Sequence, residues 1–111
     1  MALNTDDMKS DITGGKIISL GEAVRFTHAF QERNPEATKA YYAEKELVES
    51  LLQQIGCAGI RIYNGYDPDR NKANLVLVGV DKNGNDMTEG IILENLKSCP
   101  PDCPKNSSLM K

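Results

Sequence analysis

Apolar residues recur at helical spacing in the first third of the chain. The stripe comprises Leu20, Ala23, Val24, Thr27 and Phe30, with Phe26 on its flank. Ser19 precedes this stripe and Glu22 follows Ser19 three residues later, which is the spacing of a capping box. Pro35 disfavours helical geometry at the residue before it. The pattern therefore predicts a helix over residues 20–33.

A second apolar stripe follows after a short ambiguous segment. It comprises Leu47, Val48, Leu51, Leu52 and Ile55, and Gly56 is a natural C-terminal stop, so we expect a helix at about 44–55. Residues 35–43 are open to two interpretations. Asn34-Pro35-Glu36 is typical of a helix start, whereas Thr38 to Tyr42 contains the strand-forming residues of a short edge strand.

The periodicity changes after Gly56 from helical to alternating. Three strands are predicted, at residues 59–63, 74–80 and 88–93. The first should end at Asn64-Gly65, and Gly90 is expected to form a bulge in the third. Residues 81–86 contain Asn83-Gly84, which predicts a hairpin turn with both residues at positive φ.

These elements predict an α+β fold, with two N-terminal helices packed on a small, mainly antiparallel sheet of three to four strands. The folded domain is expected at residues 16–96. Residues 1–15 are polar, end in Gly14-Gly15 and are predicted to form a flexible, disordered arm. Residues 97–111 carry three prolines in the stretch from Cys99 to Pro104, and are predicted to form an extended Pro/Cys-rich tail.

The strand at residues 74–80 is apolar on both faces. Leu75, Leu77 and Gly79 point one way, and Val76, Val78 and Val80 point the other way. Such a strand is covered on both sides, and the two helices can cover only one of them. The other face, that of Val76, Val78 and Val80 or its opposite, then needs the chain's own tails, a second subunit or a ligand. A homodimer through this face and cover by the chain itself are equal alternatives.

Composition and charge exclude several classes of protein. The net charge is −3 and the pI about 5.1, with no Lys/Arg run to form the basic face that duplex nucleic-acid binding requires. No stretch approaches the length of a membrane span. The acidic, polar start lacks the features of a signal peptide. We therefore expect a cytoplasmic protein with reduced thiols.

The cysteines are the strongest candidates for chemistry. A structural zinc site needs four ligands, and Cys99, Cys103, Cys57 and the only histidine, His28, form a set of that size. Spacing supports only Cys99 and Cys103. The prolines between them preclude the helix start that activates a Cys-x-x-Cys redox motif. The alternatives to zinc are therefore thiol exchange, a disulfide or two inert thiols, with Cys57 a buried apolar residue and His28 on the rim of the core.

Arg61 and Tyr63 project from the same face of their predicted strand. They could bind an anion or a protein partner, but a cation stacked on its aromatic neighbour is the expected arrangement. No Gly-x-Ser-x-Gly elbow and no phosphate-binding loop occurs in the chain. No catalytic residue is therefore assigned.

Residues 57–103 resemble a group of small uncharacterised bacterial proteins. The matching segments are Gly59-Ile60-Arg61-Ile62-Tyr63, the strand from Leu75 to Asp81, and Cys99-Pro100-Pro101-Asp102-Cys103. No activity is established for that group. The resemblance implies that the cysteine tail is a recurring feature, and it implies no catalytic residue or cofactor.

Together these features favour a non-enzymatic interaction or structural module that binds a protein partner or a second copy of itself. No cofactor, duplex nucleic acid or membrane is expected as a partner. The alternative is a small metal-binding or thiol-redox protein that uses Cys99 and Cys103, with zinc as its metal.

Overall fold

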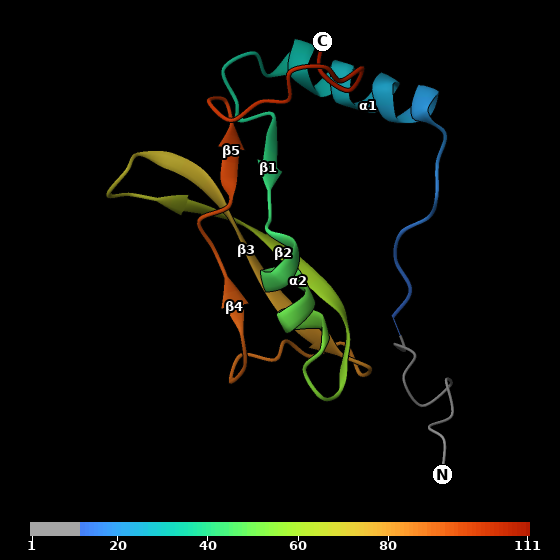
Figure 1. Ribbon diagram of the computed structural model, residues 1–111, viewed down its shortest axis with the longest axis vertical. Helices are drawn as coiled ribbons and strands as arrows, with labels where there is room; N and C mark the ends of the chain where they lie inside the picture. Colours follow the sequence, from blue (N-terminus) through green and yellow to red (C-terminus); the bar gives the residue numbers. More distant parts are fainter. Residues whose placement is uncertain (1–11) are drawn as a thin grey trace. The chain divides into compact units, whose positions relative to one another are not determined.

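The computed structural model describes residues 12–111 and has the predicted α+β fold, with two helices and antiparallel sheets of two and three strands (Figure 1). Contacts divide the chain into two compact units. The hairpin unit contains Tyr42–Leu96 with residues 12 and 13, and the helix unit contains Gly14–Tyr41 and Lys97–Lys111. The predicted flexible arm lies, as far as residue 11, outside the described residues.

Helix α1 spans Leu20–Arg33, as the sequence predicts. Ser19 is the N-cap, and its Oγ accepts a hydrogen bond of 3.1 Å from the Glu22 N–H. The carboxylate of Glu22 pairs with Arg25 at 2.9 Å rather than returning to Ser19, so only half of the capping box forms. The helix ends at Asn34, because Pro35 follows.

The ambiguous residues 35–43 contain a strand. Strand β1 (Ala40–Tyr42) pairs with β5 (Lys97–Cys99) in the two-stranded sheet, and the Lys39 N–H donates to the Cys99 carbonyl at 2.8 Å. The first residues of the predicted Pro/Cys-rich tail therefore form a paired strand. Strand β5 ends at Cys99, immediately before the first proline, so each of its residues keeps a backbone N–H for pairing.

Strands β2 (Cys57–Asp67) and β3 (Lys72–Asp81) form a long antiparallel hairpin. The prediction that Asn64-Gly65 ends the first strand is wrong, because Gly65 pairs with Asn74 inside β2. The side chain of Asn74 fills the space above Gly65, with Oδ1 2.5 Å from where a Cβ would stand. A glycine here permits close approach rather than a turn.

The turn of this hairpin lies a few residues later, between Asp67 and Lys72. The Oδ1 atom of Asp67 accepts hydrogen bonds from the N–H groups of Asp69 and Arg70 at 3.0 and 3.3 Å. Asn71 takes the left-handed conformation, with φ of 52°. This polar stretch is thus the main hairpin turn.

The predicted third strand at 88–93 is mostly wrong. The turn at residues 81–86 forms, but only Gly84 takes a positive φ, of 89°, so the prediction that Asn83 does so too is wrong. After the turn, the parts of this segment that pair with β3 are a bridge at Asp86 and the short β4 (Ile92–Leu93). The Ile91 N–H instead donates to Oε1 of Gln54 at 2.8 Å. The Gln54 side chain thus accepts the hydrogen bond from a backbone N–H that a longer third strand would use for pairing.

Helix α2 (Lys45–Leu52) packs on β2 and β3. Leu51, Leu77 and Leu93 form the buried core between them, with Leu51 fully buried. The predicted helix end at Gly56 is wrong, because the C-cap is Gln53. Gly56 has φ of 86° and turns the chain into β2, which leaves Ile55 fully exposed. Within residues 12–111, neither helix is long and apolar enough to cross a bilayer.

Candidate functional site

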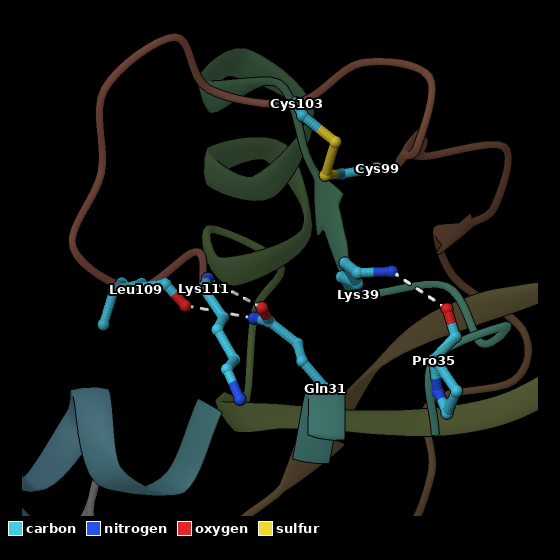
Figure 2. Close-up of a disulfide and its surroundings, with 7 residues drawn as sticks. All are labelled: Gln31, Pro35, Lys39, Cys99, Cys103, Leu109 and Lys111. Carbon is cyan, nitrogen blue, oxygen red and sulfur yellow. Dashed lines mark hydrogen bonds between the residues drawn. A yellow bond between two sulfur atoms is a disulfide. The ribbon is translucent and has the colours of Figure 1, made fainter. Parts of the chain in front are cut away.

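Polar side chains of α1 bind the segment of residues 107–111, and Figure 2 shows the contacts of one of them, Gln31, with Leu109 and Lys111. Gln31 is central, because its Nε2 donates to the Leu109 carbonyl at 3.0 Å and its Oε1 accepts from the Lys111 N–H at 2.9 Å. Thr27 Oγ1 donates to the same Leu109 carbonyl at 2.8 Å. Gln31 is 7% exposed and is the only buried residue of α1. The helix therefore buries a polar side chain against a peptide, and none of its apolar residues against a core.

Two further α1 residues contact the same segment. His28 Nε2 donates to the Ser108 carbonyl at 2.9 Å, and the Glu32 carboxylate pairs with the Lys111 ammonium. The hydrogen bond and the charge of Lys111 lower the pKa of the Glu32 carboxyl. We call Thr27, His28, Gln31 and Glu32 the α1 clamp. Their spacing places all four on one side of the helix.

The bound segment is a turn. The Ser107 carbonyl accepts from the Met110 N–H at 3.2 Å, and the Ser107 Oγ accepts from the Leu109 N–H at 3.2 Å. A serine side chain that bonds the backbone two residues later stabilises such a turn. The turn uses the Ser107 carbonyl internally, and the next two carbonyls bind the clamp.

The sequence does not predict the clamp as a site. Thr27 belongs to the apolar stripe, His28 is expected on the rim of the core, and Gln31 is part of no predicted site. One local signal could have pointed to the clamp. Gln31 lies one helical turn after Thr27, so a polar carboxamide stands on the side of the helix that was expected to be apolar. The partner segment lies about eighty residues away, with sequence separations of 78 to 82. No local pattern predicts that pairing.

The four predicted zinc ligands have different environments. Cys99 and Cys103 form a disulfide with a Cα–Cα distance of 4.6 Å, and disulfide sulfurs are not the thiolates that bind zinc. Cys57 belongs to the hairpin unit, where its Sγ lies 3.3 Å from the Gly59 carbonyl and its side chain packs against the core. His28 is in the clamp. Among residues 12–111, no three His, Cys, Asp or Glu side chains are grouped to hold a metal.

The disulfide lies at the end of β5. Cys99 is 2% exposed, whereas Cys103 is exposed. The Asp102 N–H donates to the Ser98 carbonyl at 2.9 Å, which closes the loop between the two cysteines. One half-cystine is thus buried in the helix unit, while the other stands in solvent.

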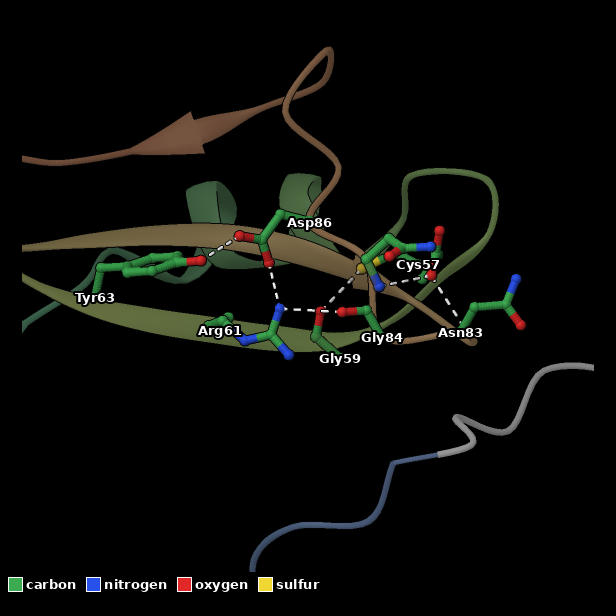
Figure 3. Close-up of polar contacts among 9 residues, drawn as sticks. Cys57, Gly59, Arg61, Tyr63, Asn83, Gly84 and Asp86 are labelled. Carbon is green, nitrogen blue, oxygen red and sulfur yellow. Dashed lines mark hydrogen bonds and ion pairs between the residues drawn. The ribbon is translucent and has the colours of Figure 1, made fainter.

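Arg61 and Tyr63 meet at a shared carboxylate (Figure 3). Nη1 of Arg61 and the hydroxyl of Tyr63 each bind one oxygen of Asp86. Arg61 also donates to the Gly84 carbonyl at 3.2 Å. The arrangement attaches the turn at residues 81–86 to strand β2.

These contacts shift the pKa values of the three side chains. The hydrogen bond from Tyr63 and the Arg61 charge lower the pKa of Asp86 below its ordinary range. The hydrogen bond to Asp86 raises the pKa of Tyr63 and also that of Arg61. Since Asp86 already compensates the Arg61 charge, an external anion would compete with an internal carboxylate. Asp86 was not identified from the sequence, because 25 residues separate it from Arg61.

The predicted interface face on β3 is largely buried within one chain. Val78 is 3% exposed and Val80 is 7% exposed, while Val76 is partly buried. Cover by the chain itself was one of the two alternatives, and it is the one found for Val78 and Val80. Val78 and Val80 are therefore shielded from water within a single chain.

No protein-family model, no curated protein and no solved structure matches this chain. The resemblance noted for residues 57–103 stays a prediction.

Proposed function

We propose that this protein is a non-enzymatic interaction module that associates with a second copy of itself through α1. The supporting observation is that the large apolar side chains of this helix are in water. Leu20 is 63% exposed, Phe26 is 51% exposed and Phe30 is 46% exposed. An amphipathic helix whose apolar residues stay exposed is typical of a protein-binding surface.

Charge complementarity favours a second copy as the partner. Phe26 and Phe30 lie one turn apart on one strip of the helix. Glu22 lies one turn before Phe26, and Arg33 lies three residues after Phe30. In an antiparallel pair of α1 helices centred on the two rings, each Glu22 approaches the partner's Arg33. Two-fold symmetry then repeats this favourable pair at both ends.

The proposed contact is small. A contact made by one 14-residue helix falls at the low end of specific interfaces, below about 1,200 Å² of total buried area. We therefore expect a reversible dimer with a dissociation constant of about micromolar or weaker.

Sedimentation velocity over a range of protein concentrations tests this proposal. The wild type should shift from monomer to dimer, and the Phe26→Gln/Phe30→Gln variant should remain monomeric. The matched control is Ile62→Gln/Tyr66→Gln on β2, which changes two side chains of 60% and 62% exposure and should still dimerise. A wild type that stays monomeric throughout, or a Phe variant that dimerises normally, would contradict the proposal.

A charge swap sharpens the same experiment. Glu22→Arg alone and Arg33→Glu alone should each weaken the dimer, because like charges then face one another. The double swap should restore association. Equal dimerisation of all four proteins would exclude the antiparallel arrangement.

Thiol exchange at Cys99–Cys103 is the second candidate function, and the exposed Cys103 supports it. A thiolate of a small thiol or of another protein would attack Sγ of Cys103. The Sγ–Sγ bond would break, and Cys99 would leave as a thiolate that takes up a proton. A second thiol would then cleave the mixed disulfide and leave both cysteines reduced. Only this reduced form could bind zinc.

The test for this candidate measures exchange between glutathione and a disulfide substrate. Faster exchange with the wild type than with Cys99→Ser/Cys103→Ser would support it, and equal rates would exclude it. Native mass spectrometry of the reduced chain with added zinc tests the metal alternative in parallel. Retention of zinc only when both cysteines are present would favour a metal site.

A further inference from the structure

We infer that the α1 clamp is a peptide-binding site for a turn of the form Ser-x-Leu-x-Lys from another chain, and that residues 107–111 occupy it in cis. The clamp lies on a different side of α1 from Phe26 and Phe30. The inference therefore does not depend on self-association.

The central contacts of the clamp are hydrogen bonds to backbone groups of the bound segment. The Gln31 carboxamide donates to the carbonyl of Leu109 and accepts from the N–H of Lys111, at 3.0 and 2.9 Å. Two donors, from Thr27 and Gln31, converge on the same Leu109 oxygen. Such contacts depend on the conformation of the bound peptide and not on its covalent connection to α1. A free peptide with the same turn presents the same groups.

Three positions of the bound segment give the site its selectivity. Ser107 closes the turn through its Oγ, and the ammonium of Lys111 pairs with Glu32. Leu109 is 38% exposed, so part of its side chain is covered. A ligand therefore needs a turn-forming serine, an apolar residue two positions later and a basic residue two positions after that.

The covalent connection of residues 107–111 to the rest of the chain lowers the apparent affinity of the clamp for a separate peptide. Residues 104–106 join the disulfide to the bound turn, and such a short linker gives an effective concentration of about millimolar. A peptide in trans competes against that concentration. The wild-type clamp is therefore blocked by its own segment, and weakening that segment should open the site.

Fluorescence anisotropy with a labelled peptide of residues 104–111 tests this inference on the full-length chain. The Lys111→Pro variant removes the N–H that Gln31 accepts and the ammonium that Glu32 binds, and leaves every clamp side chain in place. The peptide should bind Lys111→Pro about tenfold or more tighter than it binds the wild type. Adding Gln31→Ala to Lys111→Pro should reduce binding by about tenfold or more.

Two controls keep the result interpretable. A peptide with proline at the Lys111 position should not bind Lys111→Pro, and this control changes the ligand while the protein stays the same. Lys111→Pro that also carries Phe26→Gln/Phe30→Gln should bind the peptide while failing to dimerise, which separates this site from the proposed dimer. Equal affinity for the wild type and Lys111→Pro, or full binding after Gln31→Ala, would overturn the inference.

Discussion

The hairpin unit and the helix unit are stabilised by different interactions. In the hairpin unit, Leu51, Leu77 and Leu93 form a buried core beneath α2. In the helix unit, the buried residues among those described are Gln31, Ser98 and Cys99. A disulfide, a two-stranded sheet and side chain–backbone hydrogen bonds stabilise that unit in place of an apolar core.

This difference bears on function. The apolar residues of α2 fold the protein, because Leu51 is fully buried. Those of α1 do not, because Phe26 and Phe30 remain about half exposed. A helix that forms from its own local sequence and leaves its apolar side chains in solvent is suited to binding another protein.

Leu51→Ala should have the largest effect. Removing a fully buried leucine should lower the free energy of unfolding of the hairpin unit by about 2–5 kcal/mol. Leu47→Ala, in the same helix but 48% exposed, should cost about 1 kcal/mol or less. Urea denaturation measures both variants. Equal losses of unfolding free energy in the two variants would contradict the assignment of Leu51 to the core.

Removing the disulfide should affect the helix unit. Opening a loop of five residues, Cys99 to Cys103, should cost roughly 2 kcal/mol by the loop-entropy relation. Hydrogen exchange of Cys99→Ser/Cys103→Ser should accelerate in β1, β5 and residues 107–111. Protection in β2 and β3 should persist, and Cys57→Ser is the control. Uniform acceleration across both units would contradict the contrast.

Ser19→Ala should have a smaller effect, confined to α1. Loss of the N-cap bond to Glu22 should destabilise the helix by about 1 kcal/mol, since one backbone donor loses its acceptor. Ser19→Asp should restore most of the stability, because aspartate is also a good N-cap. Exchange rates of the α1 amides measure the change. An alanine variant with unchanged rates would show that the cap does not stabilise α1.

The smallest effects should come from pH. The lowered pKa of Asp86 stabilises the fold above the ordinary carboxyl pKa of about 4, and this contribution is lost as pH falls through the folded value. The raised pKa of Tyr63 stabilises the fold below the ordinary phenol pKa of about 10, and is lost as pH rises through the folded value. Denaturation midpoints across pH measure both contributions. Asp86→Asn should reduce the fall in the denaturation midpoint at acid pH, and Tyr63→Phe should reduce its fall at alkaline pH.

Local signals explain what could be predicted from the sequence. Ser19 and Pro35 fixed both ends of α1 correctly, because a cap and a proline act within a few residues. The continuous apolar run from Leu75 to Val80 predicted β3 within two residues at each end. The α+β class followed from these two periodicities.

Long-range partners explain what could not be predicted. Asn64-Gly65 looked like a turn, but pairing with Asn74 kept it inside β2. Gln54 took the N–H of Ile91 and cut the third strand short. The clamp on residues 107–111 and the Asp86 contact with Arg61 join residues far apart in the chain. None of these pairings has a signature within a short window of sequence.

Hydrogen exchange of the wild type at low and high protein concentration tests the central claim most directly, because it locates any interface on the chain. We predict that amides of α1 around Phe26 and Phe30 gain protection at high concentration, while those of β2 and β3 do not change. Added protection on β2 and β3, or none anywhere, would contradict the assignment of α1 as the interaction surface.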